Sequence, residues 1–175
     1  MRKMQTLYKQ DKEYRVTPEL RTNIKNYTMS VKRDGTSCMV KDNQLYKRYD
    51  ANAKKGRKLP NEYIACQEEP NYNGSFPVWV KVEEHDRYHH EAFKHQENWE
   101  DGTYELCGEK VNSNKENIVG HRLIKHGAEV VEGLTLDYDE IKEFLTVNKF
   151  EGLIIKDEDT GIMYKIRRRD FGLGW

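Results

Sequence analysis

The stretch VKRDGTSCMV, residues 31 to 40, places Lys32 and Asp34 two residues apart, directly before Gly35. The residues on both sides are typical of β-strands, and Asp-Gly is a strong signal for a two-residue hairpin turn. One interpretation is therefore a tight turn between two strands. The other is that Lys32 is a nucleophile, because a lysine amine that has lost its proton can form a covalent intermediate.

Three further charged segments follow in order, each inside a predicted strand. Glu105 lies in YELCGEKVNSN, Glu151 and Lys156 bracket EGLIIK, and Lys165 and Arg167 lie in YKIRRRDFG. Lys-x-Asp-Gly alone is only four residues long, and these three segments, following it in order, make the pattern more specific. The alternative interpretation of Glu105 and Glu151 is a pair of surface carboxylates at strand edges.

In this order the segments resemble the motifs of the lysine nucleotidyltransferases, the superfamily of polynucleotide ligases and capping enzymes. Lys32-Arg33-Asp34-Gly35 is similar to motif I, Glu105 to motif III, EGLIIK to motif IV and Lys165-Ile166-Arg167 to motif V. The runs YELCGEKVNSNKENIVGHRLIKHG and KIRRRDFGLGW resemble small ATP-dependent RNA ligases of the eukaryotic and viral RNA ligase 1 family. The resemblance covers nearly the whole chain.

The resemblance implies an α+β fold, in which antiparallel sheets and flanking helices surround an ATP cleft. It implies a single nucleotidyltransferase domain over residues 1–175 without a C-terminal OB-fold, because the sequence ends shortly after RRRDFG. The implied activity, in RNA repair, is the joining of RNA 5′-phosphate and 3′-hydroxyl ends through lysyl-AMP and an adenylylated RNA end. A minimal DNA ligase core and a non-catalytic RNA-end-binding module are the alternatives.

The resemblance also implies a role for each matched residue, with ATP and Mg²⁺ (or Mn²⁺) as cofactors. Lys32 is the implied catalytic residue that accepts AMP, and Glu151 the metal ligand. The implied nucleotide-binding residues are Lys32, Asp34, Gly35, Glu105, Lys156, Lys165 and Arg167. Arg48 falls where ligases keep an arginine for the RNA 5′-phosphate, a role that suits the bidentate fork of arginine. The alternative for Arg48 is a solvated cation on an edge strand.

The chemistry explains why cations accompany the lysine. A free lysine amine has a pKa of about 10.4, so that only about one molecule in 2,500 is neutral at pH 7. Nearby cations, a metal ion and partial desolvation all favour the neutral, nucleophilic amine. Lys165, Arg167 and Lys156 would supply such cations and would also hold the triphosphate.

The elements that position these residues are read from periodicity and turn signals. Residues 27–33, 36–41 and 44–49 alternate as strands, with turns at Asp34-Gly35 and Asp42-Asn43, which predicts a three-stranded meander. Residues 50–76 are typical of a long surface segment. Residues 77–82 and 102–111 are further predicted strands around a short helix over residues 87–98.

The last part of the chain predicts one helix and one hairpin. Residues 137–148 place Ile141, Phe144 and Leu145 on one helical face, with Asp137 as the expected N-cap. Residues 151–157 and 161–170 predict a hairpin around residues 159–161. Because strands outnumber helices, the pattern favours an antiparallel α+β domain.

Composition excludes some classes of protein and leaves others open. Thirty basic and thirty acidic residues give zero formal charge, so total charge indicates no partner, although basic residues concentrate at residues 46–58 and 165–170. The first cluster is interpreted equally well as a solvated face. We expect no membrane association, since the chain has no apolar run of membrane-spanning length. The resemblance leaves room for a separate RNA-binding or repair partner.

The cysteines and histidines add little chemistry of their own. Three cysteines without a CxxC pair indicate neither a disulfide framework nor a zinc site, which favours a reducing compartment and a cytoplasmic location. His85 and His89 have helical i, i+4 spacing, so a zinc site is one interpretation and a polar helix face the favoured one. His121 and His126 are expected to be structural, and the aromatic residues Trp79, Tyr104 and Phe150 to belong to the core.

Overall fold

A computed structural model describes residues 4–175, which form two compact units. The terminal unit comprises residues 4–34 and 126–175, and the middle unit comprises residues 35–125. Each unit contains its own sheet and its own apolar cluster. Within residues 4–175, no helix is both long enough and apolar enough to cross a membrane.

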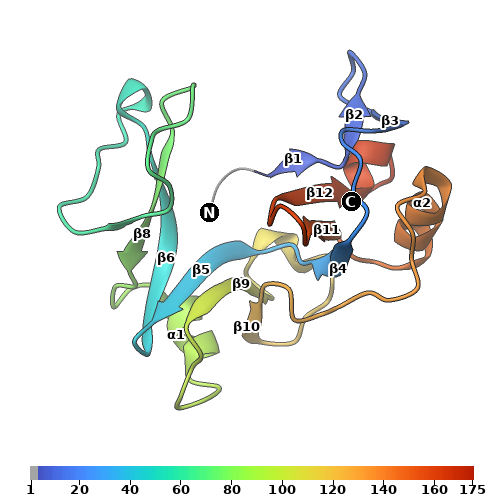
Figure 1. Cartoon of the computed structure of the whole chain (residues 1–175). Coiled ribbons are helices and arrows are strands. Elements are labelled where there is room, and N and C mark those ends of the chain that lie inside the picture. Colours follow the sequence, from blue (N-terminus) through green and yellow to red (C-terminus); the bar gives the residue numbers. More distant parts are fainter. Residues whose placement is uncertain (1–3) are drawn as a thin grey trace. The chain divides into compact units, whose positions relative to one another are not determined.

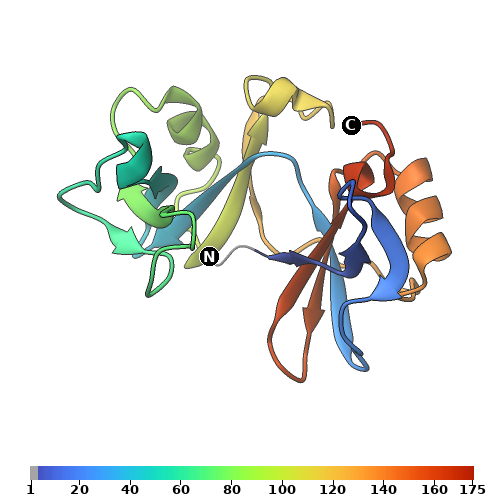
Figure 2. The ribbon, with the colours of Figure 1, turned by 90° about the horizontal axis from the view of Figure 1, so that it is seen from above.

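The terminal unit is built mainly from strands (Figures 1 and 2). Its elements are β1 Gln5–Thr6, β2 Tyr8–Gln10, β3 Val16–Leu20, β4 Tyr27–Lys32, α2 Tyr138–Val147, β11 Gly152–Asp157, β12 Met163–Arg167 and the 3₁₀ helix η3 Arg168–Phe171. The order β1-β12-β11-β4 forms what we call the Lys32 sheet, and β2 pairs with β3. β1 is parallel to β12, whereas β11 is antiparallel to both β12 and β4.

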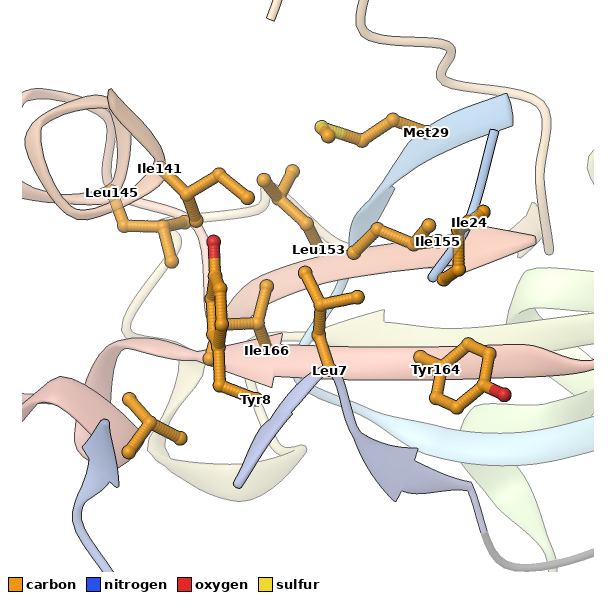
Figure 3. Close-up of a cluster of buried hydrophobic side chains, with 11 residues drawn as sticks. Leu7, Tyr8, Ile24, Met29, Ile141, Leu145, Leu153, Ile155, Tyr164 and Ile166 are labelled. Carbon is orange, nitrogen blue, oxygen red and sulfur yellow. The ribbon is translucent and has the colours of Figure 1, made fainter. Parts of the chain in front are cut away.

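The core of the terminal unit lies between the Lys32 sheet and α2. Leu153, Ile155 and Ile166 are fully buried, and Figure 3 shows them in one cluster with Ile141 and Leu145 of α2. Figure 2 shows α2, in orange, along one side of the sheet. Burying five such aliphatic side chains supplies the main driving force for this unit, at about 1.5 to 3 kcal/mol each.

The helix α2 begins where the sequence predicts. The Asp137 side chain accepts hydrogen bonds from the backbone N–H groups of Asp139 and Glu140, which confirms it as the N-cap. The predicted apolar face is also confirmed, with Ile141 and Leu145 fully buried and Phe144 partly buried against the cluster. The predicted hairpin of residues 151–170 is formed by β11 and β12.

The middle unit is an antiparallel sheet with one short α-helix among its described residues. Its elements are β5 Thr36–Lys41, β6 Gln44–Ala51, η1 Ala53–Lys55, β7 Ile64–Ala65, β8 Phe76–Lys81, α1 Arg87–Phe93, β9 Gly102–Gly108, η2 Asn112–Asn114 and β10 His121–Lys125. The order β10-β9-β5-β6-β8-β7 forms what we call the Glu105 sheet. Its apolar cluster includes Cys38, Val40, Tyr104 and Leu106.

The predicted three-stranded meander is wrong in its first strand. β5 and β6 form the expected hairpin, with Asp42 and Asn43 both at positive φ (50° and 55°), as a two-residue turn requires. β4, however, pairs with β11 and not with β5. The Asp34-Gly35 dipeptide is a connection between the two units, because pairing with β11 buries Met29 of β4 in the terminal core.

The coarse fold expectation holds: the chain is a mixed fold, rich in sheet, with two α-helices among residues 4–175. The predicted helix over residues 87–98 is shorter, because α1 ends at Phe93. The strands β1, β2, β3, β7 and β10 were not predicted, and β7 lies in the segment 50–76 that was expected to be a long surface segment. The first three are only two to five residues long, which is too short for a clear alternation pattern.

Shortening Leu153 tests the core of the terminal unit. Leu153→Ala removes a fully buried side chain and should lower the free energy of unfolding by about 2 to 5 kcal/mol. Ile154→Ala is the matched control. Ile154 follows Leu153 in β11, projects from the other face of the sheet and is only partly buried. Urea denaturation followed by circular dichroism measures both. Equal losses for the two variants would contradict the assignment of faces.

Candidate active site

Lys32 lies in a row of residues that crosses three strands. Gly152 is the register partner of Lys32 in β4 and of Arg167 in β12. The adjacent row contains Leu153 and Ile166, which face the apolar cluster. Because side chains alternate along a strand, Lys32 and Arg167 project from the opposite side, which we call the charged face of the Lys32 sheet.

Gly152 is required by the close approach of two strands. A Cβ atom at this position would lie 2.2 Å from the carbonyl oxygen of Ile166 and 2.8 Å from Cα of Arg167. Both are backbone atoms, so the neighbouring strand cannot yield locally. The glycine therefore leaves no side chain in the row between Lys32 and Arg167.

Lys32 forms an ion pair with Glu151, the residue directly before β11. Its Nζ donates a hydrogen bond to Oε2 of Glu151, and the two side chains are 22% and 16% exposed. The backbone of Glu151 is fixed as well, because its carbonyl accepts a hydrogen bond from the N–H of Arg168 at 2.9 Å. Partial burial strengthens the attraction between the two charges. The pair thus places an amine next to a carboxylate that can accept its proton or hold a cation.

Arg167 is held by a buried carboxylate that the sequence interpretation missed. Asp170 is 3% exposed and accepts hydrogen bonds from Nε and Nη2 of Arg167 at 3.0 and 2.8 Å. It also accepts from the backbone N–H of Arg167 at 2.8 Å, which caps η3. The guanidinium therefore has a fixed orientation. The Arg-x-x-Asp spacing was the available signal for this pair.

Lys165 and Lys156 occupy different places on the charged face. Lys165 lies in the row of Ser30 and Ile154, one step from the row of Lys32 on the same face. Lys156 pairs with Thr28, four residues from Lys32 along β4, or about 13 Å of strand. Its Nζ lies 3.2 Å from Glu158. The sheet therefore groups Lys165 with Lys32 and Arg167 but sets Lys156 apart from them.

The two residues after Lys32 are each fixed within the terminal unit. Arg33 forms a bidentate pair with Glu129, at 2.8 and 2.6 Å, and its guanidinium lies 4.9 Å from the ring centroid of Phe150. Asp34 accepts a hydrogen bond from Nε1 of Trp175 at 2.8 Å. Neither Glu129 nor Trp175 was singled out from the sequence, and Phe150 was expected in the core. These contacts hold the chain in place directly after the candidate nucleophile.

Gly35 and Glu105 lie together in the middle unit. A Cβ atom on Gly35 would lie 2.2 Å from the carbonyl oxygen of Leu106 and 2.8 Å from Cγ of Glu105. The carbonyl of Gly35 also accepts a hydrogen bond from Nδ2 of Asn112 at 2.8 Å. Gly35 is therefore needed for close contact with β9, not for a hairpin turn. Glu105 itself is 9% exposed, so it is not the surface carboxylate of the alternative interpretation.

Arg48 and Glu105 project from the same face of the Glu105 sheet. Cys38 pairs with Tyr104 in β9 and with Lys47 in β6, so the next residues, Glu105 and Arg48, lie on the face opposite the apolar cluster. Nε of Arg48 lies 3.1 Å from Oδ1 of Asp50, and its side chain is 26% exposed. β6 lies between β5 and β8, so Arg48 is not on an edge strand as its alternative interpretation assumed.

A cysteine nucleophile finds no support at Cys38. The thiol is fully buried, and this burial, together with the negative charge of Glu105, raises the pKa of Cys38 to about 12. The thiol is therefore protonated at neutral pH and unreactive.

The histidine-rich segment also shows structural contacts. Nε2 of His90 lies 2.8 Å from the carbonyl oxygen of Glu83, and Nε2 of His95 lies 2.9 Å from that of His121. Glu83, His85 and Asp86 do place one ligand atom each within 4.8 Å of one another. Lys47, however, donates to both oxygens of Asp86 at 2.9 and 2.7 Å, so its ammonium already supplies a cation to this cluster.

Two of the three aromatic residues expected in the core are buried: Trp79 and Tyr104 are each 4% exposed, whereas Phe150 is only partly buried. His121 is 3% exposed, and its ring stacks on Tyr88 with centroids 4.4 Å apart, as expected of a structural histidine. These residues therefore shape the middle unit and are not exposed for base stacking.

No protein-family model matches the chain, and no curated protein sequence matches it.

Proposed function

We propose that this chain is an ATP-dependent RNA ligase that works through a covalent lysyl-AMP intermediate on Lys32. The observation that supports it most is the grouping on the charged face of the Lys32 sheet. There Lys32 contacts the carboxylate of Glu151, Arg167 lies in the same row as Lys32, and Lys165 projects from the next row on the same face. The sequence resemblance supplies the reaction class, and this grouping supplies an amine, a proton acceptor and phosphate-binding cations.

The proposed first step is the attack of the neutral Lys32 amine on the α-phosphate of ATP. A P–N bond forms, the P–O bond to pyrophosphate breaks, and the proton leaving Nζ passes to Glu151 or to solvent. Lys165 and the N–H groups of Arg167 that do not face Asp170 stabilise the charge on the phosphate oxygens. Because Asp170 fixes the guanidinium, Arg167 is oriented before the substrate arrives.

The next two steps transfer AMP and seal the strand. An RNA 5′-phosphate oxygen attacks the lysyl-AMP phosphorus, the P–N bond breaks, and an adenylylated RNA end forms. A 3′-hydroxyl then attacks the RNA 5′-phosphorus, so that a phosphodiester forms and AMP leaves. Dividing one condensation into successive transfers lowers each barrier, and this is the advantage of covalent catalysis.

The donor set of the charged face fits a magnesium ion. Mg²⁺ is usually held by one or two carboxylates together with substrate phosphates and water, and Glu151 is a partly buried carboxylate next to Lys32. When bound, the ion would neutralise phosphate oxygens and weaken the hold of the carboxylate on the ammonium proton. Glu151 is the residue that would hold the ion.

The covalent intermediate is the direct test of the proposal. The protein, incubated with ATP and Mg²⁺, should gain the mass of one AMP, and Lys32→Ala should gain none because it lacks the attacking amine. Intact-mass spectrometry measures the adduct, and nicked RNA, nicked DNA and single-stranded RNA are then offered in parallel. The matched control is Lys25→Ala, an exposed lysine of the same unit. An adduct on Lys32→Ala would sink the assignment.

Replacing Glu151 separates its charge from its shape. Glu151→Gln keeps the size of the side chain but removes its charge, so it should bind Mn²⁺ at least tenfold more weakly and lose metal-stimulated adduct formation. Electron paramagnetic resonance of Mn²⁺ measures binding independently of activity, and circular dichroism checks the fold. Glu129→Gln is the matched control, since Glu129 pairs with the neighbouring Arg33. Unchanged Mn²⁺ binding in Glu151→Gln would rule out the metal role.

Arg48 tests the RNA half of the reaction. Arg48→Ala should leave lysyl-AMP formation nearly intact but slow sealing of 5′-phosphorylated RNA roughly tenfold or more, because a charged hydrogen bond is worth about 1.5 to 3 kcal/mol. Arg48→Lys should recover only part of the rate, since lysine lacks the fork. The assay follows a single turnover of preformed lysyl-AMP enzyme. If Arg48→Ala seals RNA at the normal rate, Arg48 does not bind the RNA 5′-phosphate and its role is limited to the contact with Asp50.

A further inference from the structure

Four cations lie in one short turn that the proposed ligation chemistry does not use. Residues 52–58, which we call the basic turn, follow β6 and contain Lys54, Lys55, Arg57 and Lys58 without a carboxylate. All four side chains are exposed. Among residues 4–175 they make no ion pair, in contrast to Lys47, which is held by Asp86. The turn is therefore a local concentration of uncompensated positive charge.

The basic turn is closed by its own backbone. Asn52 and Arg57 exchange two hydrogen bonds, at 2.8 and 3.0 Å, and the N–H of Gly56 donates to the carbonyl of Ala53 at 3.1 Å. Gly56 is left-handed at φ 70°, and Asn52 is only 2% exposed. The cations thus project from a defined loop and not from a free chain, so less entropy is lost when a ligand binds them.

A second turn with an exposed aromatic ring lies against the first. Residues 71–75 are closed by hydrogen bonds from Asn71 N–H to Ser75 and from Gly74 N–H to Asn71, both 2.8 Å. The two turns leave the same end of the β6–β8 pairing, whose last pair is Ala51 with Phe76 (Figure 1). Tyr72, in the second turn, is 96% exposed.

Two contacts join the turns. Nδ2 of Asn52 donates to the carbonyl of Asn73 at 3.3 Å, and a Cβ atom on Gly74 would lie 3.3 Å from Cδ of Lys54. The methylene stem of Lys54 therefore packs beside the turn that carries Tyr72. The exposed ring of Tyr72 and the exposed cations of the basic turn therefore lie on two adjoining turns.

We propose that the basic turn and Tyr72 form a binding surface for single-stranded RNA. Cations that bind successive phosphates, beside an exposed ring on which a base stacks, are how proteins bind single strands. A duplex offers phosphates but no exposed base face, so it would contact the cations of the basic turn but would not stack on Tyr72. The choice of RNA over DNA rests on the proposed function, whereas the choice of a single strand rests on the exposed ring.

The charge contribution is tested by equilibrium binding without ATP. Fluorescence anisotropy of a labelled twelve-nucleotide single-stranded RNA should show at least tenfold weaker binding when Lys54, Lys55, Arg57 and Lys58 are all replaced by Gln. The slope of log affinity against log salt should fall by about 3, at about 0.7 per phosphate contact. The matched control replaces the exposed Lys12, Lys25, Lys41 and Lys94 by Gln, which is the same change in net charge. Equal losses in both variants would overturn a localised surface.

The ring contribution needs its own variants. Tyr72→Ala should weaken single-strand binding at least fivefold, Tyr72→Phe should bind normally because the ring and not the hydroxyl stacks, and duplex RNA should be insensitive to both. Normal single-strand binding by Tyr72→Ala would overturn the proposal, and equally tight binding of single-stranded DNA would overturn the choice of RNA.

Adduct formation with ATP is measured in the same proteins. If no AMP adduct forms but these binding differences hold, the surface stands and the ligase proposal fails; if adducts form and binding is unchanged, the surface alone fails.

Discussion

The pairing of β11 with strands on both of its sides is the constraint on which the terminal unit depends. Leu153 and Ile155 of β11 are fully buried, so a register shift by one residue would turn both toward the charged face. The same register fixes Lys32 and Arg167 on either side of Gly152. Packing of apolar side chains on one face therefore determines the spacing of charged side chains on the other.

The charges on the charged face are largely balanced within the chain. Lys32 contacts Glu151, Arg167 contacts Asp170, and Lys156 lies beside Glu158. A triphosphate that binds here has to compete with carboxylates for the same donors, which opposes its binding. A divalent ion that accompanies the triphosphate reduces this opposition, because it supplies positive charge to the carboxylates and the phosphates together. The proposed need for metal follows from this balance as well as from the chemistry.

Local signals in the sequence were sufficient where the structure is local. The Asp42-Asn43 hairpin, the Asp137 cap and the β11–β12 hairpin all join residues close in sequence. The partner of β4 was missed because Lys32 and Glu151 are 119 residues apart, and no turn signal reports on such a pairing. Glu129 was missed for the same reason, because it is 96 residues from Arg33. Asp170 is only three residues from Arg167, and its Arg-x-x-Asp spacing was a local signal that was not used.

The connection at Asp34-Gly35 shows how a strong local signal is overruled. Asp34 is fixed in the terminal unit by Trp175, and Gly35 is fixed in the middle unit by Asn112 and by its close approach to β9. A hairpin would have paired β4 with β5, yet each strand buries apolar residues in the cluster of its own unit. Burial of a single core side chain contributes about 1.5 to 3 kcal/mol, and this long-range packing overrides the local turn signal. The dipeptide therefore joins two units, and Lys32 lies two residues before the point where the chain passes from one to the other.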